Sequence, residues 1–128
     1  MKKPVLLALF FAAFAFAIPA TAQEKAKWKE MENFHGVMST TFHPAEEGKF
    51  EPIRTRSGEM VEKAIAWKNS TAPEGFNQEA VQKILVKLVK AAKKVKNLVQ
   101  KSASDADLKE QLTALHDIFH EIAEKCQH

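Results

Sequence analysis

Two short histidine clusters hold the residues of this chain that are best able to do chemistry. Four of the five histidines lie in the segments 34–44 and 115–120. His116 and His120 are four residues apart, so on a helix their imidazoles lie on one face. A helix with this spacing can present two imidazoles to one metal ion. The clusters are therefore the candidate binding site of this chain.

The N-terminus has the features of a secretory signal peptide. Two lysines are followed by an apolar run over 5–18 and by the small residues Ala20-Thr21-Ala22, a pattern that predicts cleavage before Gln23. The apolar run is too short for a membrane anchor. We expect a signal peptide over 1–22 and an exported domain over 23–128 that lies in the periplasm or is secreted and is not embedded in a membrane.

The predicted mature chain suits one domain with a modest core, since it has 106 residues. Loss of the two N-terminal lysines lowers the formal net charge from +3 to +1. The segment 83–101 nevertheless stays strongly basic, which indicates a solvated helix face first and a surface for an acidic partner as the alternative. No nucleic-acid-binding motif is present.

Cys126 is the only cysteine, so an internal disulfide is excluded. A free thiol, an intermolecular disulfide and a peripheral metal ligand are the interpretations that stay open. An exported protein meets an oxidising compartment, which permits a disulfide-linked homodimer.

The apolar residues recur at helical spacing throughout the predicted mature chain. In the first segment the seam consists of Trp28, Met31, His35, Met38 and Phe42. Pro44 is predicted to end this helix, with 45–47 as the acidic first turn of the next. The alternative is that the second helix begins only at Pro52.

Later signals mark two more helices. Residues 69–76 contain Pro73 and Gly75 and predict a loop, after which Asn77 is a candidate N-cap. Ser104 resembles a cap for the last helix, whose apolar face consists of Leu108, Leu112, Leu115, Phe119 and Ile122. No segment predicts a strand. The fold class is therefore all-α, an antiparallel up-down-up-down four-helix bundle.

In such a bundle the first and last helices are antiparallel neighbours. At 1.5 Å per residue, His35 comes to about the height of His116, and His120 to that of Met31. His35 falls near the centre of its helix's apolar stripe, while His116 and His120 fall on the flank of theirs. His43 is expected at the end of the bundle, away from this group.

Convergence of these imidazoles predicts a metal site. His35, His116 and His120, with Met38 as a thioether neighbour, suit copper or zinc. The plainer alternative is a satisfied core histidine at 35 and two interfacial polar residues. Glu32 and Asp117 precede histidines by three residues, as in di-iron bundles, but no matching carboxylate follows on the third helix. No catalytic arrangement is visible, so we do not expect an enzyme.

The whole mature chain resembles the periplasmic cytochrome c-prime and b-type cytochrome four-helix bundles. The resemblance is carried by Phe119-His120, late in the last helix, and by Met31, early in the first. It implies the bundle fold, export and an electron-transfer role with non-covalent haem b between Met31 and His120. The segment 116–120 lacks the Cys-x-x-Cys-His motif, so covalent haem is excluded.

Three functions thus stay open. The first is metal handling by an exported protein that binds copper or zinc through His35, His116 and His120, with Met38. The second is electron transfer by a haem b protein with Met31 and His120 as axial ligands. The third is a helical interaction protein without a cofactor.

Overall fold

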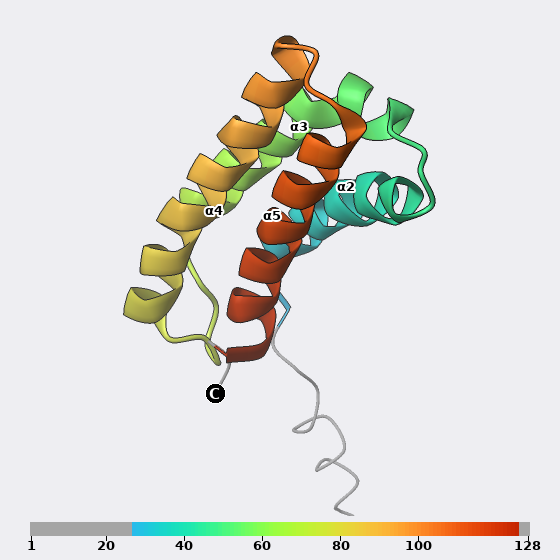
Figure 1. Cartoon of the computed structure of the whole chain (residues 1–128). Coiled ribbons are helices and arrows are strands. Elements are labelled where there is room, and N and C mark those ends of the chain that lie inside the picture. Colours follow the sequence, from blue (N-terminus) through green and yellow to red (C-terminus); the bar gives the residue numbers. More distant parts are fainter. Residues whose placement is uncertain (1–26, 126–128) are drawn as a thin grey trace, which may run out of the picture.

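The computed structural model describes residues 27–125, which form four helices (Figure 1). They are α2 (Lys29–Glu46), α3 (Glu51–Lys68), α4 (Gln78–Gln100) and α5 (Asp105–Lys125). No strand occurs in this range, so the all-α prediction is confirmed. The predicted signal peptide, 1–22, lies outside the described residues. Of the four helices, none has both the length and the apolar character needed to cross a bilayer.

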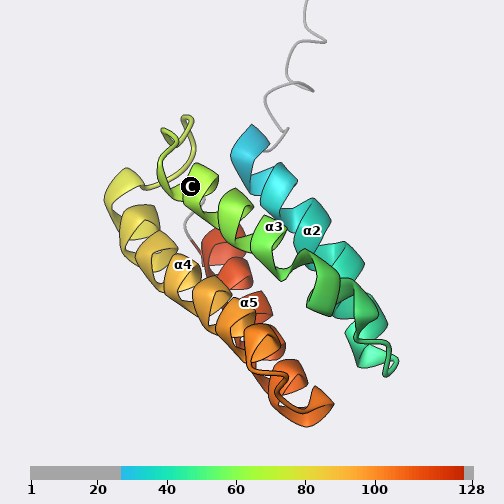
Figure 2. The ribbon, with the colours of Figure 1, turned by 90° about the horizontal axis from the view of Figure 1, so that it is seen from above.

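Each helix packs against two others. Consecutive helices lie side by side, and α5 also packs against α2, as Figures 1 and 2 show. The apolar face predicted for the last helix is confirmed, because all five of its residues are at most 5% exposed. Burial of one face from each helix produces a single core, the arrangement expected of a four-helix bundle.

The predicted start signals of the last two helices are confirmed by their hydrogen bonds. The Asn77 side chain accepts a hydrogen bond from the backbone N–H of Ala80 at 3.0 Å. Ser104 Oγ accepts one from the N–H of Asp107 at 3.1 Å. Each side chain satisfies a backbone donor that the first turn of a helix leaves without a partner.

The prediction that Pro44 ends the first helix is wrong. α2 continues to Glu46, and the chain turns away from the helix at Gly48, whose φ of 87° is left-handed. There the Lys49 N–H donates to the carbonyl of Pro44 at 2.8 Å, and the Gly48 N–H to that of Ala45 at 3.0 Å. This pair of bonds is a Schellman motif. Pro44 is tolerated because in the last turn its missing N–H removes only one helical bond.

The second helix begins at Glu51, with Pro52 in its first turn. The alternative start at Pro52 is therefore confirmed, and residues 45–47 belong instead to the end of α2 and its cap. A proline is favourable in this position because its φ already suits a helix and no intrahelical donor is lost.

The buried face of α2 is rotated from the predicted seam. Its members are Phe34, Val37, Met38, Thr41, Phe42 and Ala45. His35 is exposed and lies at the edge of this face, so its predicted place at the centre of the stripe is wrong. The placement of His116 and His120 on the flank of α5 is confirmed, since both are half-buried.

Aromatic side chains from α2, α3 and α5 pack together in the core. The Phe34 ring centroid lies 5.6 Å from that of Trp67 and 6.1 Å from that of Phe119. Trp28 adds an edge-on contact with Trp67 at 5.8 Å, and its indole N–H donates to Ser70 Oγ at 2.8 Å. Aromatic pairs at these distances add to the free energy of area burial.

Phe34→Ala should lower the free energy of unfolding by about 3–5 kcal/mol, because it leaves a cavity among three helices. Chemical denaturation followed by circular dichroism measures the change. Val86→Ala is the control: Val86 is 46% exposed, so we expect a change within about 0.5 kcal/mol. Equal effects of the two substitutions would contradict the assignment of Phe34 to the core.

Candidate metal site

His116 and His120 form a close pair on the flank of α5. Their Nε2 atoms are 3.2 Å apart, and the two ring planes meet at 74°. A tetrahedral ion with metal–nitrogen bonds of about 2.0–2.1 Å holds two ligand nitrogens about 3.3 Å apart. The two nitrogens thus have a separation that suits shared coordination, as the four-residue spacing predicted.

Glu124 determines which nitrogen of His120 carries the proton. Its Oε2 lies 2.8 Å from Nδ1 of His120, and a carboxylate can only accept a hydrogen bond. Nδ1 of His120 therefore donates, which leaves the lone pair of the neutral ring on Nε2, directed at His116. A carboxylate bonded to the far nitrogen of a histidine ligand is a common support of metal sites. Sequence reasoning missed Glu124, although its i, i+4 spacing from His120 could have indicated it.

Phe42 of α2 supports the ring of His116. The two rings stack with centroids 4.1 Å apart and planes within 11° of parallel. Burial and the adjacent His120 lower the pKa of His116 below its usual 6.5, against the opposite effect of Asp117 and Glu46. The imidazole is thereby kept neutral, which is the form that binds a metal.

The register of α2 against α5 differs from the prediction. His116 lies against Phe42 rather than at the height of His35, and Phe119 is the residue that meets His35. His43 is exposed in the last turn of α2, where its Nδ1 lies 3.4 Å from Glu46 Oε1. Its placement near the end of the helix agrees with the prediction.

His35 and Met38, the other predicted ligands, have different surroundings. The His35 ring stacks on Phe119 at 4.9 Å with planes 8° apart. Met38 is 1% exposed and belongs to the core. Within residues 27–125, no three imidazole, thiol or carboxylate groups are placed to hold one ion. The structure thus brings together His116 and His120, and not the whole predicted set.

The two residues predicted to bind haem have different surroundings. Met31 is half-buried against the core, whereas Nε2 of His120 faces His116 and Nδ1 faces Glu124. Haem ligation by His120 would require His116 to turn away. The haem site stays a prediction, and so does the Cys126-linked homodimer, because Cys126 lies outside the described residues.

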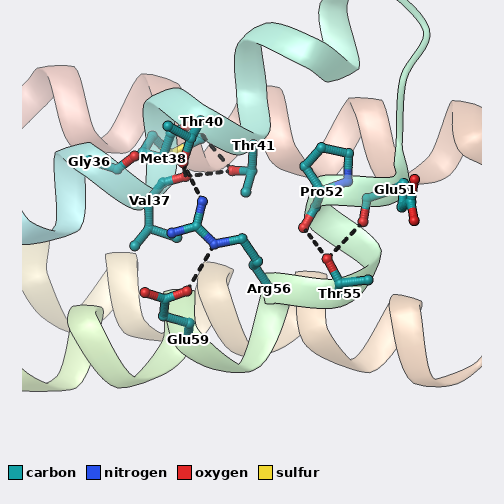
Figure 3. A network of polar contacts seen from close by, with 10 residues as sticks. All are labelled: Gly36, Val37, Met38, Thr40, Thr41, Glu51, Pro52, Thr55, Arg56 and Glu59. Atoms are coloured by element: carbon teal, nitrogen blue, oxygen red, sulfur yellow. Dashed lines mark hydrogen bonds and ion pairs between the residues drawn. The ribbon is translucent and has the colours of Figure 1, made fainter.

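A polar groove of about 440 Å³ between α2 and α3 is the other candidate site. Arg56 lines this groove, and its Nη1 donates to Thr40 Oγ1 at 2.6 Å and its Nε to Glu59 at 2.9 Å, as Figure 3 shows. The hydrogen bond from Arg56 lowers the pKa of Glu59. Because these two charges are already paired, we interpret the groove as a polar link between the two helices.

Comparisons of the chain with protein families, curated proteins and solved structures find no match. The resemblance to periplasmic cytochromes therefore stays a prediction.

We expect the metal-free protein to lose stability in acid partly through His116. Its lowered pKa means that the unfolded chain takes up this proton first, so the contribution is complete above pH 6.5 and is lost as the pH falls through the folded pKa. One proton limits the slope to about 1.4 kcal/mol per pH unit. Denaturation between pH 7.5 and 4.5, with a chelator present, measures it.

Two variants distinguish the contribution of His116 to the pH dependence of stability from the contributions of other titrating groups. His116→Gln should flatten the profile below pH 6.5. Asp117→Asn removes a charge that favours the imidazolium, so the loss of stability should move to lower pH. An unchanged profile in both variants would rule out a contribution from His116.

Proposed function

We propose that this protein binds a transition-metal ion, copper or zinc, through Nε2 of His116 and His120 and serves in metal handling. The observation that carries the proposal is the 3.2 Å separation of the two nitrogens, which suits two ligands of one ion. Imidazole is a common ligand of both metals. On binding, the ion takes the place of the hydrogen between the two nitrogens, and the proton of the neutral His116 ring moves from its Nε2 to its Nδ1.

The surroundings of the pair support metal exchange more than a closed structural site. Both histidines are half-buried, and the His120 side chain is 43% exposed. Two protein ligands leave coordination positions for water or for a donor from another molecule, whereas structural zinc sites are closed by four protein ligands. An open site of this kind suits sequestration or delivery.

His35 and Met38 are left out of the proposed ligand set. The face of the His35 ring is stacked on Phe119, and the Met38 side chain is enclosed in the core. Recruiting either one would break contacts that stabilise the packing of α2 on α5. Among the described residues no third group is placed to complete the set, so the remaining coordination positions are left to water or to a donor from another molecule.

We also infer export and an up-down-up-down topology. The signal-peptide pattern of 1–22 supports a periplasmic or secreted location. Antiparallel order of α2 and α5 is supported by their contacts, because His116 lies against Phe42 and Phe119, further along α5, lies against the earlier Phe34. Short links between helices that pack side by side support the same order for the other pairs.

The metal-binding proposal is tested by titrating copper or zinc into protein of residues 23–128 against a chromogenic chelator. His116→Ala and His120→Ala should each weaken binding at least about 100-fold, since a single imidazole remains. His35→Ala is the control and should change the affinity less than threefold. Equal binding by wild type and both α5 variants, or a Soret band lost only in His120→Ala after haem addition, would overturn the proposal.

Glu124→Gln should weaken metal binding about 10- to 100-fold, the usual effect of removing a carboxylate that orients a histidine ligand. The same competition titration measures it. Glu121→Gln is the matched control, because Glu121 lies three residues earlier on α5 and contacts Lys87 at 3.5 Å. If both substitutions had the same effect, general loss of negative charge would explain it and the role of Glu124 would be refuted.

A further inference from the structure

A straight row of lysines runs along the outer surface of α4 and reaches its C-cap residue, Lys101. We call it the lysine ridge, and its members are Lys83, Lys87, Lys90, Lys94 and Lys101, all exposed. They recur at intervals of four, three, four and seven residues. At 100° per residue, all five lie within about 40° of one line parallel to the helix axis.

The lysine ridge points away from the rest of the molecule. The buried residues of α4, among them Leu85, Leu88 and Ala92, lie on the opposite side of the helix from the ridge. α4 packs against α3 and α5 alone among the described helices, and both contacts use the buried side. Figure 2 shows α4 along one outer edge of the bundle, with no other helix over its outer side.

The positive charge of the ridge is poorly balanced by its neighbours. Glu79, in the first turn, is the only carboxylate of α4. Among the ion pairs of residues 27–125, one involves the ridge, between Lys87 and Glu121 at 3.5 Å. An ordinary solvated helix face alternates charges, because like charges at i, i+4 destabilise a helix. The pairs 83/87 and 90/94 are both like-charged.

We propose that the lysine ridge binds the surface of an anionic lipid bilayer. A cluster of four to eight lysines on an amphipathic helix is typical of sites for anionic headgroups. The ridge is convex and straight, so it can contact a plane along its whole length. Proteins that bind single-stranded nucleic acids instead use a groove lined with aromatic side chains, and the exposed large apolar residues of the described chain are only Ile65 and Val86.

Val86 adds an apolar contact to the same surface. It is 46% exposed, and it lies beside the line of the ridge, one turn before Lys90. Apolar side chains next to lysines on an interfacial helix enter the boundary between headgroups and acyl chains. The proposal describes peripheral binding and does not rest on the metal site.

Vesicle co-sedimentation of residues 23–128 tests the proposal, with phosphatidylglycerol vesicles against neutral phosphatidylcholine vesicles. Each lysine near an anionic leaflet raises the partition coefficient about fivefold. The triple variant Lys83→Gln, Lys90→Gln and Lys94→Gln should therefore bind phosphatidylglycerol about 100-fold more weakly. Raising the salt from 0.05 to 0.5 M should abolish wild-type binding, because the attraction is screened.

A matched triple variant distinguishes the effect of the ridge lysines on vesicle binding from the effect of a lower net charge. Lys29→Gln, Lys68→Gln and Lys109→Gln remove the same charge from the other three helices and should change partitioning less than about fivefold. Circular dichroism verifies that both triples are folded. Equal losses in the two triples, equal binding to neutral vesicles, or binding of heparin without binding of vesicles would each overturn the proposal, the last in favour of a soluble acidic polymer.

Discussion

The packing of Phe119 against Phe34 and Trp67 sets how α5 lies on α2, and the position of every imidazole depends on it. These rings fill the core where three helices meet. Sliding α5 by one turn would place a differently shaped side chain against Phe34 and open a cavity, at a cost of several kcal/mol. The same register stacks His35 on the ring of Phe119 and brings His116 onto Phe42.

The parts of the fold that depend on local interactions could be predicted from the sequence. The caps at Asn77 and Ser104 each involve residues within three positions of one another. The apolar face of α5 follows from helical periodicity alone. The end of α2 is harder to predict, because a proline in a last turn and a proline that ends a helix have the same local sequence pattern. The end is set by the left-handed cap at Gly48, two residues beyond the helix end.

In the candidate site, too, local geometry could be predicted and contacts between helices could not. The His116–His120 pair could be predicted because the α-helix itself sets i, i+4 geometry. The residue of α2 that lies against this pair could not be predicted, because the register of α2 on α5 depends on how their aromatic side chains pack. His116 therefore lies against Phe42, seven residues or about two turns along α2 from the predicted partner His35. Glu124 follows from helix geometry alone, because it lies four residues after His120 on the same face of α5.

The two proposed surfaces are separated by the bundle itself. α2 and α4 do not pack against each other in the described chain, because α3 and α5 lie between them. The lysine ridge occupies the outer side of α4, whereas His116 of the histidine pair stacks on Phe42 of α2. A molecule held at an anionic surface by the ridge would thus keep His116 and His120 clear of that surface. Each helix buries its apolar face in the shared core and leaves its polar face exposed. The exposed faces of different helices can therefore carry separate binding surfaces.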